Sequence, residues 1–124
     1  MIVIQTLNYQ ESLKFIEESH KFGIRLGLEN SLKLLELLGN PQDKLKIIHV
    51  AGTNGKGSVC SFIANSLHAQ GYKVGLYTSP YLEKFTERIR INGENIPEED
   101  VARIVTLMRE KIEQMVKDGF SYPT

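Results

Sequence analysis

The stretch Lys46–Ser58, KIIHVAGTNGKGS, places a short apolar run directly before a glycine-rich turn. The run over 46–51 is almost entirely apolar and stops at Gly52, a pattern typical of a strand buried on both faces of a parallel sheet. From Lys56 onward the apolar residues take helical spacing, with one face formed by Val59, Phe62, Ile63 and Leu67. The stretch therefore predicts a strand, a glycine turn and a helix in direct succession.

A second apolar run follows this helix and completes the unit. Gly71 is placed to end the helix, and Lys73–Thr78 is again mostly apolar. Two strands joined by a helix are expected to lie parallel with a right-handed crossover, because nearly all such connections have that hand. Residues 46–78 thus predict the fold class: α/β, with a P-loop-type parallel sheet flanked by helices.

The residues before this unit predict two helices. The first covers 9–20, and the segment Lys21–Leu28, which contains two glycines, is expected to be a loop. A second helix begins near Asn30 and ends at Gly39-Asn40-Pro41, because a glycine after the last turn and a proline behind it stop a helix. Its apolar stripe is expected to consist of Leu32, Leu35 and Leu38.

The residues after the unit predict an exposed loop, a hairpin and a final helix. The loop covers 79–87, and the hairpin pairs Glu87–Ile91 with Glu94–Ile96 around Asn92-Gly93, a dipeptide suited to a type I′ turn. Pro97 then opens the helix, and acidic residues in its first turn complement the helix dipole. The buried face of this helix is expected to consist of Val101, Ile104, Val105, Met108, Ile112 and Met115.

Composition narrows the class of protein further. The chain has 124 residues, 41% of them hydrophobic, with 15 basic and 15 acidic side chains. A formal charge of zero gives no support for binding nucleic acid or membrane through bulk electrostatics. The single cysteine, Cys60, cannot form an internal disulfide, and no secretory leader is recognisable. These features predict a globular protein of the cytoplasm, with neither nucleic acid nor membrane as a partner.

The turn Gly52–Ser58 carries the strongest chemical signal. Glycines let backbone N–H groups converge on an anion, and a helix N-terminus adds free donors and the positive end of the helix dipole. Lys56 adds a point charge within reach of β- and γ-phosphates. The spacing departs from G-x-x-x-x-G-K-[ST], because Val50 stands at the first glycine position and Gly57 follows the lysine. The turn predicts nucleotide binding; the alternative is an ordinary glycine turn with a solvated lysine.

Three segments resemble the folylpolyglutamate synthase and dihydrofolate synthase family of the Mur ligase superfamily. Ile48–Ser58 resembles the family signature around its short phosphate loop. Leu26–Glu29, followed by a leucine-rich helix and Gly39-Asn40-Pro41, resembles the family's N-terminal segment. Gly75–Pro80 and then Phe85–Ile89 resemble the strand and loop that follow the phosphate-loop helix. The resemblance covers nearly the whole chain, and together the segments are highly specific.

The resemblance implies an ATP-dependent amide ligase. Such enzymes use Mg-ATP to phosphorylate a carboxylate of dihydropteroate or folate, and the amine of L-glutamate then displaces phosphate from the acyl phosphate. Family members are much longer than this chain. Residues 1–124 are therefore expected to be the truncated N-terminal portion of the ATP-binding domain, without the C-terminal domain and inactive alone. The complete enzyme is expected to be a monomer.

The resemblance also assigns the nucleotide and metal residues. Gly52, Thr53, Asn54, Gly55, Lys56, Gly57 and Ser58 match the loop that wraps the phosphates. Lys56 takes the catalytic role of stabilising charge during phosphoryl transfer. Ser79 matches a magnesium ligand, whose carboxylate and imidazole partners would lie beyond the chain; from spacing alone, Ser79 is an ordinary strand-ending Ser-Pro turn.

Substrate residues follow in the same way. Leu26 and Gly27 match a segment that lines the pterin pocket, and Thr124 matches the start of a Thr-x-Phe-Glu stretch that helps bind dihydropteroate. Tyr81 and Phe85 lie in the loop that shapes the pterin site, where they either pack against a flat heterocycle or anchor the loop itself.

Two other functions stay open at this point. One is a non-catalytic nucleotide-binding or interaction module. The other is a Mur-type ligase acting on a peptidoglycan precursor, although Gly57-Ser58 and Ser79-Pro80 favour the folate branch. Nothing in the sequence separates a dihydrofolate synthase from a folylpolyglutamate synthase or from an enzyme that does both.

Overall fold

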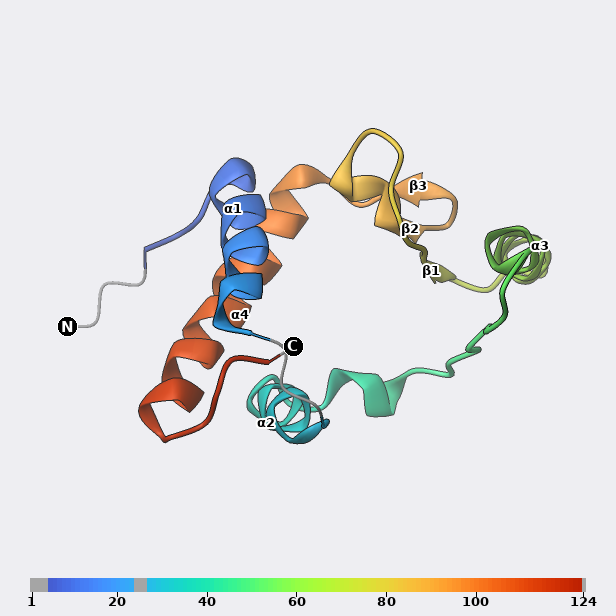
Figure 1. Cartoon of the computed structure of the whole chain (residues 1–124). Helices are drawn as coiled ribbons and strands as arrows, with labels where there is room; N and C mark the ends of the chain where they lie inside the picture. The colour runs from blue at the N-terminus through green and yellow to red at the C-terminus, as the bar shows by residue number, and fades with distance from the viewer. Residues whose placement is uncertain (1–4, 24–26, 124) are drawn as a thin grey trace. The chain divides into compact units, whose positions relative to one another are not determined.

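The computed structural model describes residues 5–23 and 27–123. The chain divides into two compact units (Figure 1): residues 1–46 with 99–124, here called the helical unit, and residues 47–98, here called the sheet unit. No helix of the described residues combines the length and the hydropathy that crossing a bilayer requires.

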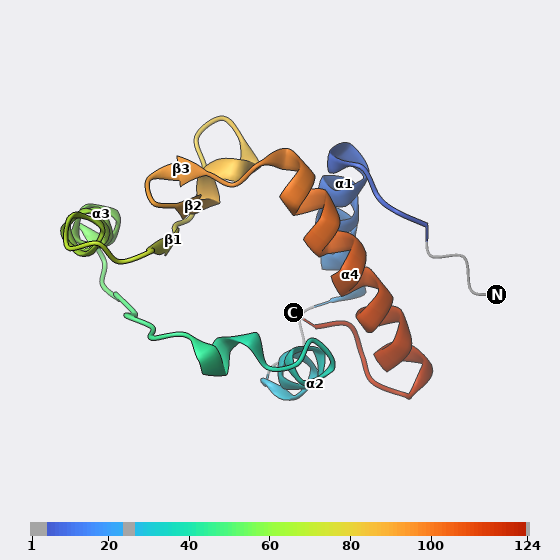
Figure 2. The same cartoon turned by 180° about the vertical axis from the view of Figure 1, so that it is seen from behind.

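The helical unit is built from α1 (Tyr9–Ser19), α2 (Glu29–Leu37) and α4 (Glu98–Lys117), with short 3₁₀ turns at His20–Phe22 and Pro41–Lys44. Figures 1 and 2 show α1 alongside α4 from opposite sides. Three helices were predicted here, and all three are confirmed. Asn8 and Glu11 form a capping box at α1, in which the Glu11 N–H donates to the Asn8 side chain at 2.8 Å and the Asn8 N–H donates to the Glu11 carboxylate at 2.9 Å.

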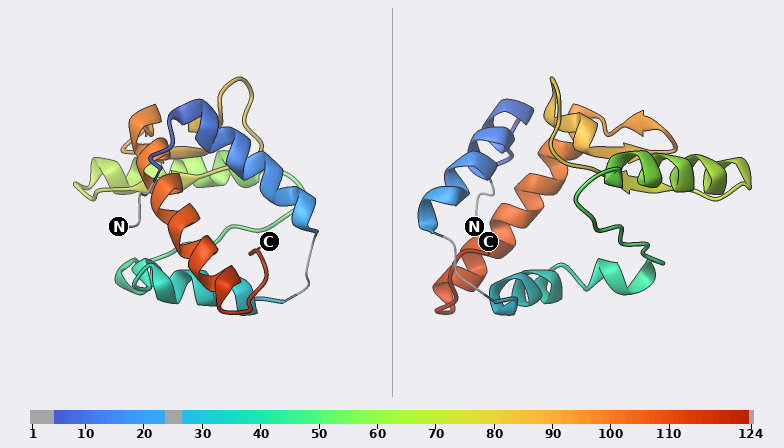
Figure 3. Two further views of the ribbon diagram at one scale, coloured as in Figure 1. Left: turned by 90° about the vertical axis from the view of Figure 1, so that its left-hand side faces the viewer. Right: turned by 45° about the vertical axis from the view of Figure 1, so that its right-hand side comes forward.

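The core of the helical unit joins α2 to the C-terminal half of α4 (Figure 3). Its buried members are Leu34, Ile112 and Met115, and Met115 is fully enclosed. Around them pack Phe15, Leu37, Leu38, Met108, Phe120 and Tyr122. Because burying a large apolar side chain is worth about 1.5–3 kcal/mol, this cluster supplies a large share of the unit's stability.

Two residues of the predicted apolar faces are exposed. Leu32, which was predicted for the apolar stripe of α2, is 57% exposed; the buried residue is Leu34, and the partly buried Leu37 and Leu38 pack against its cluster. Both stripes fit a helical period, so the sequence alone could not choose between them. Ile104 is 37% exposed because it lies at the edge of the α4 stripe, whose centre is formed by Val101, Val105, Met108, Ile112 and Met115.

The sheet unit contains α3 (Lys56–Ala69) and a small sheet. Its strands are β1 (Gly75–Tyr77), β2 (Ile89–Ile91) and β3 (Glu94–Asn95), and a 3₁₀ turn at Phe85–Arg88 leads into β2. The order is β1-β2-β3 and both pairings are antiparallel, with Leu76 opposite Arg90 and Arg90 opposite Asn95.

The predicted hairpin is confirmed, with shorter strands. Asn92 and Gly93 connect β2 to β3 with φ of 51° and 84°, the two positive values that a type I′ turn requires. The Asn92 side chain also accepts a hydrogen bond from the Val74 N–H at 2.8 Å, so the turn residue is tied to the approach to β1. The sequence signal and the observed turn therefore agree in detail.

The predicted parallel pair is absent from the described residues. The segment 46–51 forms no strand, and the pairing partner of β1 is β2 rather than this segment. Ile47 and Ile48 are 68% and 61% exposed. A strand is stabilised by hydrogen bonds to a neighbouring strand. The segment 46–51 has no such neighbour among the described residues, so its apolar sequence does not form a strand.

The predicted apolar face of α3, formed by Val59, Phe62, Ile63 and Leu67, is only partly covered. Val59 and Phe62 are 45% and 72% exposed, whereas Ile63 and Leu67 are half-buried. Residues of the neighbouring face instead line a shallow hollow between α3 and the sheet: Ser61, Ala64, Asn65 and His68 from the helix, with Val74, Leu76, Arg90, Asn92 and Gly93 opposite. The helical spacing thus predicts α3 correctly, whereas the side of α3 that faces the sheet is set by residues outside the apolar pattern.

Candidate functional site: the phosphate loop and the loop after β1

The phosphate loop, residues 52–58, leads directly into α3. Gly55 is the N-cap residue and has a left-handed backbone, with φ of 77° and ψ of 1°. Its carbonyl accepts the Val59 N–H at 3.0 Å, so the helical hydrogen bonding starts here. The N–H groups of Lys56, Gly57 and Ser58 come before that first bond and have no acceptor within the helix. They form an exposed set of donors at the positive end of the helix dipole, which suits a phosphate.

The ammonium of Lys56 is folded over this loop. Its Nζ donates to the carbonyl oxygen of Gly52 at 2.5 Å and lies 3.5 Å from that of Thr53. The side chain is exposed, and no buried partner holds it in this position. Phosphate oxygens can therefore replace the two carbonyl oxygens by a rotamer change alone, because exposed side chains change rotamer within nanoseconds.

Ser79 lies just past the end of β1 and is exposed. Within residues 5–23 and 27–123, no hydrogen bond or ion pair joins it to the phosphate loop, and no three His, Cys, Asp or Glu side chains converge where they could hold a metal. A hydroxyl alone is a weak ligand for Mg²⁺, which prefers carboxylates, phosphates and water. The described residues therefore do not complete a magnesium site on their own.

The side chains of Tyr81 and Phe85, predicted to serve the pterin site, are in contact with each other. Their rings meet edge to face with centroids 6.2 Å apart. The guanidinium of Arg88 lies over both, with its Cζ 5.0 Å from the Tyr81 centroid and 5.9 Å from that of Phe85. The two rings and Arg88 thus contact one another within this loop, and Tyr81 keeps 43% of its surface exposed.

Sequence reasoning missed the residue that organises this loop. The Glu87 carboxylate accepts hydrogen bonds from the backbone N–H groups of Leu82, Glu83 and Lys84, at 3.0, 3.0 and 2.8 Å. The bonds from Leu82 and then Lys84 are the main reason that the pKa of Glu87 is lowered from its ordinary value. A glutamate three residues after the N-cap of a short helix is a known capping signal, and it could have pointed to Glu87.

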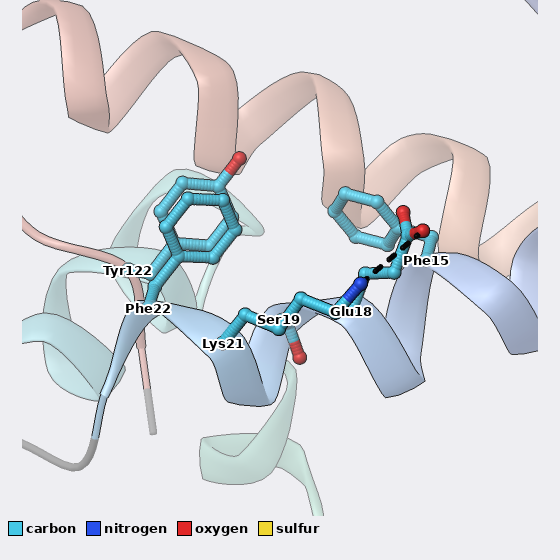
Figure 4. Close-up of a pocket in the computed structure, with 6 residues that line it drawn as sticks. All are labelled: Phe15, Glu18, Ser19, Lys21, Phe22 and Tyr122. Atoms are coloured by element: carbon cyan, nitrogen blue, oxygen red, sulfur yellow. Dashed lines mark ion pairs between the residues drawn. The ribbon is translucent and has the colours of Figure 1, made fainter.

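The remaining predicted substrate residues are Leu26, Gly27 and Thr124. Leu26 and Thr124 lie outside the described residues, and Gly27 is exposed with φ of 114°. Close to them in sequence, the rings of Phe22 and Tyr122 stack face to face, with centroids 4.0 Å apart and planes within 10° (Figure 4). An ion pair of 3.8 Å between Glu18 and Lys21 lies next to Phe15 in the same view. The stack joins the two segments that carry the predicted pterin residues.

Comparison with known proteins gives a consistent set of relatives. No model of a known protein family matches the chain. The dihydrofolate synthase/folylpolyglutamate synthase of Bacillus subtilis is 40% identical over 116 residues, which are 94% of this chain and 27% of that relative. The folylpolyglutamate synthetase structure from Lactobacillus casei superposes with a TM-score of 0.85 at 39% identity, covering 95% of this chain and 30% of that one. An FPGS–AMPPCP–folate complex superposes with a TM-score of 0.84 at 38% identity.

These comparisons confirm the predicted fold class, the N-terminal part of a Mur ligase-like ATPase domain. The helices and the antiparallel sheet described above match the N-terminal domain of the FPGS structures. The chain spans 27% of the length of the Bacillus subtilis relative, so the likeness concerns this part of the relatives only.

Proposed function

The chain belongs to the folylpolyglutamate synthase/dihydrofolate synthase family, and on that premise we propose that it supplies the ATP-binding loop of a ligase that adds L-glutamate to dihydropteroate, to reduced folates or to both. The observation that carries the proposal is the exposed set of N–H donors at the start of α3 with the ammonium of Lys56 folded over it. An FPGS of this fold is known in complex with AMPPCP and folate, which supports ATP as the nucleotide and folate as the substrate class.

The proposed reaction has two steps. An oxygen of the substrate carboxylate attacks the γ-phosphorus of ATP, and the bond from that phosphorus to the β–γ bridging oxygen breaks, giving an acyl phosphate and ADP. The glutamate amine then attacks the acyl carbon, phosphate leaves, and the amine loses a proton. In the first step the N–H groups of residues 56–58 hold the phosphates and the Lys56 ammonium neutralises charge on the transferred group.

Mg²⁺ is part of the proposal, and Ser79 is its proposed ligand in this chain. When bound, the ion neutralises phosphate charge and orients the transferred group. Because no acidic or imidazole cluster accompanies Ser79 in the described part of the chain, most ligands of the ion must come from the nucleotide, from water or from residues outside it.

Activity is proposed for the full-length ligase, and this chain alone is proposed to bind nucleotide without turnover, because it spans 27% of the Bacillus subtilis relative. We also propose a monomeric enzyme located in the cytoplasm. The alternative is a non-catalytic nucleotide-binding module, for which the exposed N–H donors at the start of α3 would be sufficient.

Calorimetric titration of the chain with Mg-ATP tests the first part of the proposal, with the Lys56→Ala variant as comparison. Binding that is lost in the variant is the expected result; no binding to the unchanged chain would reject the phosphate-loop assignment. A ligation assay of the full-length enzyme with dihydropteroate, tetrahydrofolate and a nucleotide-linked muramyl substrate tests the second part. Turnover of the muramyl substrate alone would reject the folate assignment.

A further inference from the structure

The carboxylate of Glu87 accepts three backbone hydrogen bonds from the loop that follows β1. Oε2 of Glu87 accepts the Leu82 N–H, and Oε1 accepts those of Glu83 and Lys84. The Glu87 N–H in turn donates to the Lys84 carbonyl at 3.0 Å. The loop tip, residues 82–84, is therefore bonded to the side chain and to the backbone of the same residue.

Packing does not hold this tip in place. Leu82 is 92% exposed, and the side chains of Glu83 and Lys84 are exposed as well. An apolar side chain left almost entirely in water contributes nothing through burial. The position of the tip is consequently set by its hydrogen bonds to Glu87.

The residues on either side of the tip carry the edge-to-face ring pair and the guanidinium that lies over it. Tyr81 precedes it, and Arg88 directly follows Glu87, with its guanidinium over the Tyr81 and Phe85 rings. The Arg88 Nε is buried and has no hydrogen-bond partner within residues 5–23 and 27–123. Thr86, between Phe85 and Glu87, is buried at 5% exposure. A shift of the tip would move Tyr81 relative to Arg88, because the chain between them is closed through Glu87.

We propose that Glu87 is a positioning residue for the folate-type substrate: its carboxylate fixes residues 82–84 and thereby the placement of Tyr81 against Arg88. The inference rests on the proposed function, because it assigns the purpose of the loop to that substrate. Glu87 does not need to touch the substrate for this role.

The Glu87→Gln variant tests the proposal with little change in size. Glutamine keeps one acceptor oxygen and turns an NH₂ group toward at least one of the N–H donors, so the three bonds cannot all form. Glu83→Gln is the matched control, because it removes the same charge from a side chain that lies four residues away, is exposed and accepts none of these bonds. Amide exchange measured by NMR on the chain should accelerate at Leu82, Glu83 and Lys84 in Glu87→Gln by about tenfold or more, and remain unchanged in Glu83→Gln.

Steady-state kinetics of the full-length ligase separate positioning from a general loss of structure. In Glu87→Gln the KM for tetrahydrofolate should rise about tenfold, with kcat and the KM for ATP close to those of the unchanged enzyme. Unchanged amide exchange at the tip would overturn the proposal, and so would faster exchange with an unchanged KM for tetrahydrofolate. If the unchanged enzyme does not ligate glutamate to a folate, the proposed function fails, whereas the exchange measurement still decides whether Glu87 fixes the tip.

Discussion

The Lys56 ammonium donates at 2.5 Å to the carbonyl oxygen of Gly52, four residues earlier in the same loop. The charged Lys56 side chain thus donates to a backbone carbonyl just before α3, next to the N–H groups of the first helical turn, which have no acceptor in the helix. The Lys56 ammonium therefore lies where an anion would bind, and the loop around it is exposed to solvent. For this reason Lys56 is the first residue to substitute.

Lys56→Ala should weaken binding of Mg-ATP to the chain by at least tenfold, because a hydrogen bond to a charged group contributes about 1.5–3 kcal/mol. Turnover of the full-length ligase should be abolished. Lys46→Ala, which removes an exposed lysine ahead of the loop, is the matched control and should bind normally. Calorimetry measures both affinities, and circular dichroism checks that the fold is retained. Equal affinities in the two variants would contradict the role given to Lys56.

Gly55→Ala should destabilise the chain by roughly 1–2 kcal/mol, because φ of 77° is unfavourable for a residue with a Cβ. Collision is not the reason, since an added Cβ at Gly55 meets no atom within 4 Å. Gly57→Ala has the same free space but lies inside the helix, where alanine is favoured by about 1 kcal/mol. Urea unfolding should therefore move in opposite directions for the two variants. A parallel shift would show that backbone conformation is not what distinguishes them.

Met115→Ala should lower the free energy of unfolding by about 2–5 kcal/mol, because it opens a cavity beside Leu34 and Ile112. Val116→Ala, the next residue on α4 and 40% exposed, should change it by no more than about 0.5 kcal/mol. Urea denaturation of both variants measures the difference. Equal effects would place the core of the helical unit elsewhere.

The sequence predicted each element that local rules control. Helical spacing located α1, α2, α3 and α4, and Asn92-Gly93 located the hairpin with its two positive φ values. Gly55 and Lys56 were identified because a glycine turn before a helix is a local pattern with a direct chemical meaning. These features depend on residues a few positions apart, so the sequence contains the information needed to find them.

Features that depend on distant partners were not predictable in the same way. The segment 46–51 has the composition of a buried parallel strand, but a strand requires a neighbour, and β1 pairs with β2 instead. The choice of Leu34 rather than Leu32 depends on where α4 meets α2. The stack of Phe22 on Tyr122 joins residues far apart in the chain that no local pattern connects.

The order of the loop tip should depend on pH through Glu87. The hydrogen bonds from Leu82, Lys84 and Glu83, in that order, and then the charge of Arg90 lower its pKa in the folded state from the ordinary value of 4.5. A carboxyl group with a lowered folded pKa contributes stability that is present in full above 4.5 and is lost as the pH falls through the folded pKa. The tip should therefore stay ordered at neutral pH and loosen only below that value.

NMR titration of the chain from neutral pH to about pH 2.5 measures this directly. The amide signals of Leu82, Glu83 and Lys84 should move together, with a midpoint below 4.5 that Glu87→Gln removes and Glu83→Gln leaves in place. A midpoint above 4.5 would mean that the carboxylate is not stabilised by these N–H groups, since only an interaction with the ionised form lowers a carboxyl pKa. The tip would then be held by something other than the charge of Glu87, and the positioning role would lose its physical basis.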